Sequence, residues 1–78
     1  RYNLALSLIA TDSLADAERE LQTVLNLDDR YWPAYHRLGE VLITRDRPDE
    51  ARGDLEELVA NNPSYPEIAA VQELLAGL

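Results

Sequence analysis

The sequence predicts an all-α fold: an α-solenoid segment of two stacked antiparallel helical hairpins and a C-terminal helix. Three observations lead to this prediction. Apolar residues recur with the spacing of an α-helix and without the alternation of a strand. The pattern repeats itself with a period of about 34 residues, within the range that is typical of helical repeats. Turn-forming residues separate the helical stretches by short connections, which require neighbouring helices to run antiparallel.

The repeat becomes visible when the sequence is placed beside itself so that Leu4 meets Leu38. Large and small residues then match in kind, as shared core positions should. Tyr31 also meets Tyr65, and this recurrence predicts that both tyrosines pack between hairpins. The other matching pairs are Ala5 with Gly39, Leu8 with Leu42, Ile9 with Ile43, Asp12 with Asp46, Asp16 with Glu50, Ala17 with Ala51, Leu21 with Leu55 and Val24 with Leu58.

The first two predicted helices cover residues 1–10 and 14–27. Each carries a single apolar stripe, which indicates one buried face. Ser13 stands directly before the second helix and Asp16 follows three residues later, so we expect a capping box. The stripe residues are Leu4, Ala5, Leu8 and Ile9 in the first helix and Ala17, Leu21, Val24 and Leu25 in the second.

The third and fourth predicted helices cover residues 32–45 and 48–60. Trp32, at the start of the third, is expected to be partly exposed. Pro48 occupies the first position of the fourth, where proline is favoured because its missing N–H is not needed. Gly53 lies within the fourth helix, where no packing role requires it, so we expect it to face solvent.

The fifth predicted helix covers residues 66–77 and follows the chain-breaking segment 61–67, in which Ser64 and Glu67 predict a second capping box. Its apolar residues cover more surface than one packing stripe needs. Either further repeats cover them in a longer chain, or they form a homodimer interface with a second copy. These residues are Ile68, Val71, Leu74, Leu75 and Leu78.

The length predicts one small domain spanning residues 1–78. Residues 1–31 form an incomplete first repeat, residues 32–65 a second repeat, and residues 66–78 a terminal helix or truncated third repeat. Because the chain holds no methionine and is helix-patterned from its first residue, we expect it to be a fragment of a longer protein.

The charge balance excludes several classes of partner. Fifteen acidic residues against seven arginines give a net charge of −8, which repels phosphate backbones, so no nucleic acid is expected. No apolar run approaches the roughly 20 residues that a membrane helix needs. We expect a soluble chain; the sequence does not define its compartment, with a weak preference for the cytoplasm. Cysteine is absent, which excludes thiolate metal sites and cysteine nucleophiles.

The pair most typical of catalysis is His36 and Glu40, one helical turn apart. A zinc site needs three or four ligands, and this is the only histidine in the chain. The carboxylates around residues 48–59 suggest a solvated acidic face rather than an acid–base pair. We therefore expect no enzyme activity, no metal and no cofactor.

The second repeat carries small residues at two positions, Gly39 and Ala51, where larger side chains would push the two helices of a hairpin apart. Pro63 ends the fourth helix. With these residues the sequence resembles the tetratricopeptide repeat family, although Leu58 stands where that family has alanine. The matching residues, counted from Trp32, are Tyr35, Leu38, Gly39, Leu42, Ala51, Leu55, Leu58 and Pro63.

The resemblance implies a non-catalytic protein–protein interaction scaffold that binds a peptide or a neighbouring protein segment in a concave groove. The family's lysine and asparagine clamp for a chaperone carboxylate is absent here, so an apolar or basic peptide is expected. The alternatives are an accessory segment of a larger enzyme and a self-association module. The implied groove residues are Tyr2, Asn3, Leu6, Ile9, His36, Arg37, Glu40, Ile43, Glu67 and Ala70.

Overall fold

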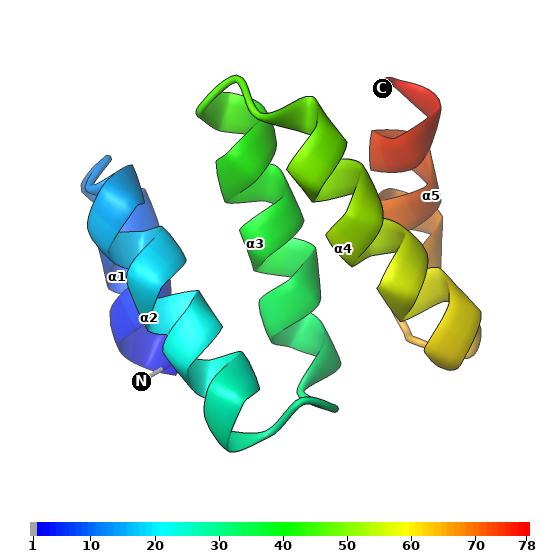
Figure 1. Ribbon diagram of the computed structural model, residues 1–78, viewed down its shortest axis with the longest axis horizontal. Coiled ribbons are helices and arrows are strands. Elements are labelled where there is room, and N and C mark those ends of the chain that lie inside the picture. The colour runs from blue at the N-terminus through cyan, green and yellow to red at the C-terminus, as the bar shows by residue number, and fades with distance from the viewer. Residues whose placement is uncertain (1) are drawn as a thin grey trace.

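The computed structural model describes residues 2–78, which form five α-helices joined by short turns (Figure 1). The helices lie within two residues of their predicted bounds, and Arg1 falls outside the described residues. The predicted all-α class is therefore confirmed. The helices are α1 (Tyr2–Ala10), α2 (Leu14–Leu27), α3 (Trp32–Thr44), α4 (Pro48–Asn61) and α5 (Ile68–Ala76).

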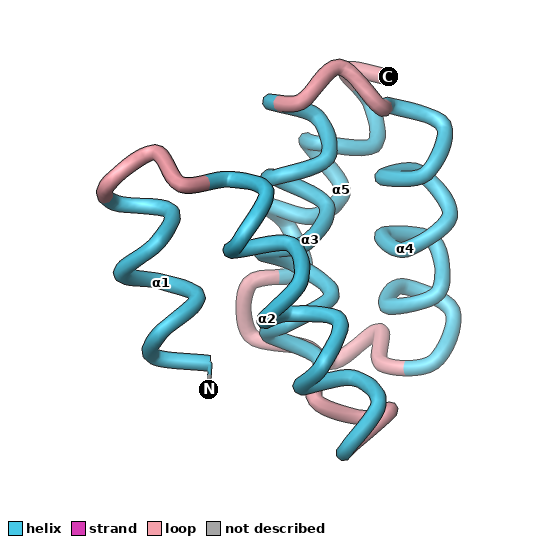
Figure 2. Tube along the Cα trace, turned by 60° about the vertical axis from the view of Figure 1, so that its left-hand side comes forward, coloured by secondary structure: helices cyan, strands magenta, loops and turns pink. Residues whose placement is uncertain are grey.

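The helices α1 and α2 form one hairpin and α3 and α4 a second, while α2 also packs against α3 and α5 against α4. In Figure 2, α1 lies to the left of α2, and α3 and α5 lie to the left of α4. We call the side formed by α1, α3 and α5 the first-helix face. The side formed by α2 and α4 is the second-helix face.

The turn within each hairpin has the same backbone geometry. Asp12 and Asp46 adopt φ angles of 63° and 61°, the left-handed conformation that commonly ends a helix. In the first turn the amide of Ser13 donates to the carbonyl of Leu8 at 2.7 Å, and the amide of Asp12 to that of Ile9 at 3.0 Å. The second turn makes both hydrogen bonds between the equivalent residues, at 2.8 and 3.1 Å. The repeat thus extends to the hydrogen bonds of the turns.

Both predicted capping boxes are wrong. Ser13 precedes α2 but makes no side-chain cap hydrogen bond, and Asp16 pairs with Arg19 at 2.6 Å. A capping box needs the free amide of the cap residue, and the Ser13 amide already donates within the turn. The second box fails because α5 begins only at Ile68, and the Ser64 hydroxyl donates to the Asn62 side chain at 3.2 Å.

Within each hairpin, the two helices cross at a small residue. Ala5 is fully buried in the first hairpin, and Gly39 occupies the equivalent place in the second. A Cβ atom at Gly39 would lie 2.6 Å from Cδ2 and 2.7 Å from Cγ of Leu55, which is itself fully buried. In contrast, a Cβ at Gly53 would meet no atom within 4 Å, so this glycine faces solvent as expected.

A charged contact joins the first hairpin to the turn of the second. The Glu18 carboxylate of α2 accepts hydrogen bonds from Arg45 and Arg47, each at 2.7 Å. The Glu18 side chain is 12% exposed, whereas the two arginines are about one-third exposed. This nearly buried carboxylate therefore fixes how the second hairpin stacks on the first.

Two further expectations about burial need correction. Leu4 is 50% exposed, whereas its repeat equivalent Leu38 is 3% exposed, because α2 packs on α3 and no helix among residues 2–78 takes the corresponding place beside α1. The surplus apolar surface expected on α5 is also smaller than predicted. Val71 is fully buried and the other four residues are partly buried, because all five pack against the core; these four are Ile68, Leu74, Leu75 and Leu78.

None of the helices in residues 2–78 has both the length and the apolar character needed to span a membrane.

Candidate functional site

The first-helix face carries a hollow of about 290 Å³ between α1 and α3. Four of the ten predicted groove residues line it: Leu6, Ile9, Arg37 and Glu40. Three further lining residues, Leu14, Val41 and Thr44, were not predicted. We call the surface formed by these seven residues the first-helix groove.

The floor of the first-helix groove is apolar and its rim carries one ion pair. The Arg37 guanidinium donates to the Glu40 carboxylate at 2.8 Å, and both side chains are partly buried. The hydrogen bond to Glu40, followed by one to the Tyr2 hydroxyl, raises the pKa of Arg37 against the opposing effect of burial. The arginine therefore stays charged and held against the rim, where it can meet a polar group of a bound segment.

Helical spacing explains why α3 supplies four of the lining residues. Glu40, Val41 and Thr44 follow Arg37 by three, four and seven residues, which places all four on one side of the helix. This spacing is a signal by which Val41 and Thr44 could have been found in the sequence. Leu14 is the first residue of α2, and the α1–α2 turn places it beside the groove. Spacing within one helix therefore does not reveal it.

His36 does not belong to the groove, contrary to the prediction. It is 4% exposed, and its ring lies edge-on to Tyr65 with the ring centroids 5.8 Å apart. Its Nδ1 atom lies 3.2 Å from the Tyr65 hydroxyl and 3.2 Å from the Glu67 carboxylate. The segment leading into α5 therefore covers the ring, and Glu40 pairs with Arg37 instead of His36.

The first hairpin contains an equivalent aromatic contact. The Tyr2 and Tyr31 rings also meet edge-on, with centroids 5.2 Å apart. In the repeat register these two residues are the counterparts of His36 and Tyr65. As predicted, the two recurring tyrosines pack where one hairpin leads into the next helix. Burial and the neighbouring Glu67 raise the pKa of Tyr65 to about 12, so its hydroxyl remains a proton donor at neutral pH.

The remaining predicted groove residues take other places. Asn3 and Ala70 are exposed on α1 and α5 and do not line the hollow. Ile43 is partly buried and packs against two groups of buried core residues, one between Ala5 and Ala51 and the other between Leu55 and Val71 along the chain. Glu67 lies beside His36, as described above. Within residues 2–78, no three histidine, cysteine, aspartate or glutamate side chains come together in a way that could hold a metal ion.

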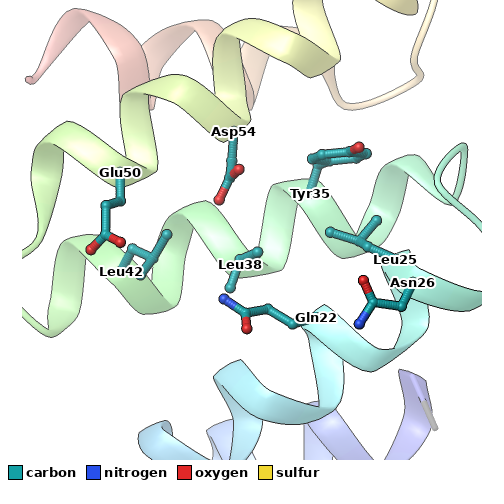
Figure 3. Close-up of a pocket in the computed structure, with 8 residues that line it drawn as sticks. All are labelled: Gln22, Leu25, Asn26, Tyr35, Leu38, Leu42, Glu50 and Asp54. Carbon is teal, nitrogen blue, oxygen red and sulfur yellow. The ribbon is translucent and has the colours of Figure 1, made fainter.

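A second hollow, of about 490 Å³, lies on the second-helix face between α2 and α4, with α3 beneath it (Figure 3). It was not predicted. The other four carboxylates of α4 are exposed, which agrees with the expected solvated acidic face. Asp54 points into it and is partly buried. We call this surface the second-helix groove; its lining residues are Gln22, Leu25, Asn26, Tyr35, Leu38, Leu42, Glu50 and Asp54.

The two hairpins, their shared repeat register and their crossing at small residues together describe a helical repeat. Comparison with curated proteins and with solved structures gave no match. The family model described as tetratricopeptide repeat matches residues 8–75, which include most of both hairpins and of α5. The chain belongs to the tetratricopeptide repeat family.

Proposed function

We propose that this chain is a non-catalytic interaction module that binds a peptide, or a segment of a neighbouring protein, in the first-helix groove. Tetratricopeptide repeat domains generally mediate protein–protein interaction and are typically non-catalytic. The observation that carries the proposal is the hollow of about 290 Å³, in which an apolar floor and a fixed ion pair lie side by side.

The groove would bind its segment through two kinds of contact. Leu6, Ile9 and Leu14 are partly exposed and offer apolar surface for one or two large side chains, and this burial would supply most of the affinity. Arg37 and Glu40 offer a donor and an acceptor at the rim, which would fix the register and direction of the segment. Because so small a contact is also opposed by the entropy of association, we expect weak, transient binding.

The test is a pair of double variants. Peptides that bind the wild-type chain are first selected from a displayed random library. Arg37→Ala with Glu40→Ala is then expected to weaken their binding about tenfold, measured by calorimetry, because the rim contacts are lost. The matched control is Asp16→Ala with Arg19→Ala, which removes an ion pair of the same i, i+3 spacing from α2, outside the groove.

Melting curves of both double variants show whether they remain folded. Unchanged affinity in the groove variant, or an equal loss in the control, would contradict the proposal.

The two alternatives make different predictions. A segment that serves as an accessory part of a larger enzyme would use the same groove for a neighbouring domain, and the proposed test then applies with that domain as the ligand. Self-association through α5 has less support, since Val71 is fully buried and the other apolar residues of α5 pack on the core. A concentration-dependent mass in light scattering would support self-association; a constant monomer mass would contradict it.

A further inference from the structure

The second-helix groove combines four kinds of surface that one side chain could contact together. Its floor is formed by the apolar residues Leu25, Leu38 and Leu42. The aromatic ring of Tyr35 lies at one end of the groove (Figure 3). The Asp54 carboxylate projects from α4 toward Leu38. Amide groups from α2 form the opposite wall; they belong to Gln22 and Asn26.

The Asp54 carboxylate has no cationic partner among residues 2–78, in contrast to the nearby Glu50 and Glu18. Glu50, also in this groove, is bound by Arg47, and Glu18 is bound by Arg45 and Arg47. A partly buried carboxylate without such a partner in a chain of net charge −8 favours a ligand that brings its own positive charge.

We propose that the second-helix groove binds an arginine side chain of a basic peptide segment, with the guanidinium paired to Asp54 and facing the Tyr35 ring. A guanidinium suits this site better than an ammonium. It can donate two parallel hydrogen bonds to one carboxylate and can stack on an aromatic ring. The aliphatic part of the arginine would lie on the partly exposed Leu25.

The electrostatics of Asp54 agree with this assignment. Burial, and then the negative charges of Glu50, Glu18 and Glu57, raise the pKa of Asp54 to about 6. Glu50 and Glu57 belong to its own helix and Glu18 to α2, while α3 contributes the uncharged Tyr35. A bound cation would relieve this repulsion and favour the ionised form of Asp54.

The site can be tested with three capped five-residue peptides that carry a central arginine, citrulline or lysine between two leucines. Citrulline keeps the shape of arginine without its charge. Binding to the ¹⁵N-labelled chain is followed by NMR, which detects millimolar affinities. The fluorescence of Trp32 gives a second readout, because its ring stacks on Tyr35 with the centroids 5.4 Å apart.

The arginine peptide is expected to shift the resonances of Gln22, Asn26 and Trp32, and to bind at least about tenfold more tightly than the citrulline peptide. The lysine peptide is expected to bind more weakly than the arginine peptide. Between pH 5 and pH 7.5 the arginine affinity is expected to rise about tenfold, because Asp54, with a pKa of about 6, loses its proton over this range.

Asp54→Asn is expected to remove both the preference for arginine and its pH dependence. The matched control is Asp49→Asn, the same charge change at an exposed position on the same helix, outside the groove. Three results would overturn the proposal: equal binding of arginine and citrulline, an equal loss in the two variants, or resonance shifts centred on Leu6 and Arg37 instead. Equal binding of arginine and lysine would overturn the assignment of a guanidinium. The peptide comparison uses the unmodified chain, so it stands even if a variant fails to fold.

Discussion

The two helices approach each other closely in both hairpins, but different residues allow this approach. The two helices of the first hairpin cross at Ala5, and those of the second hairpin cross at the equivalent position, Gly39. Leu55 of the second hairpin lies so close to Gly39 that even a Cβ atom would meet its Cγ at 2.7 Å. The repeat register therefore fixes which positions face the crossing, while the residues of each hairpin set the separation of its two helices there.

The hairpins differ in charge as well. Glu18 in α2 binds two arginines of the next hairpin, whereas the equivalent place in α4 is Arg52, which is exposed. The edge-on aromatic contact is kept in both hairpins, but Tyr2 is replaced by His36 in the second. The side-chain contacts of the two hairpins with their neighbours thus differ even where the backbone repeats.

The largest effect is expected from Gly39→Leu. The new side chain would need the space that Leu55 fills, and overpacking of this size costs about 3 kcal/mol or more, which is a large part of the folding stability of a domain this small. Thermal melting by circular dichroism measures the loss. The control is Gly53→Leu, which lies on the other helix of the same hairpin and faces open space. A normal melting curve for Gly39→Leu would show that α3 and α4 do not cross closely at this residue.

A smaller loss, of about 2 kcal/mol, is expected from Glu18→Gln, because a neutral amide replaces the carboxylate that binds both Arg45 and Arg47. Urea unfolding measures it. Arg52→Gln, at the equivalent place in the second hairpin, is exposed and should change stability by less than about 0.5 kcal/mol. Equal effects of the two substitutions would contradict a stabilising role of Glu18 that its counterpart in the second hairpin lacks.

A third effect depends on pH. The pKa of Asp54 is raised from 3.8 to about 6 in the folded chain, so between these values the folded state holds a proton that the unfolded state has lost. This group therefore makes the folded state less stable as pH rises from about 4 to 6. Asp54→Asn is expected to remove that contribution, as measured by urea unfolding at several pH values. Parallel pH profiles for the variant and the wild type would contradict the raised pKa.

Much of the fold could be predicted because it depends on local patterns. Helical spacing and turn residues locate every helix within two residues, and the repeat register identifies Gly39 as a crossing residue. The burial of His36 could not be predicted in this way, because it depends on Tyr65 and Glu67, which lie in the segment between α4 and α5.

The candidate sites were predictable only in part. Leu6, Ile9, Arg37 and Glu40 follow from the repeat register and the family resemblance. The second-helix groove was missed, since it forms between α2 and α4 only after the hairpins stack. A carboxylate such as Asp54 has no sequence signature that separates it from the exposed acids on the same helix.

The repeat register decides which positions are packed and which are open. One measurement tests it directly: the free energies of unfolding of Gly39→Ala and Gly53→Ala, determined side by side in urea. At Gly53 alanine should stabilise the chain by about 1 kcal/mol through helix propensity alone. At Gly39 the contact with Leu55 should outweigh that gain and destabilise the chain by about 1 kcal/mol or more. Opposite signs are the predicted result, and stabilisation of similar size at both positions would contradict it.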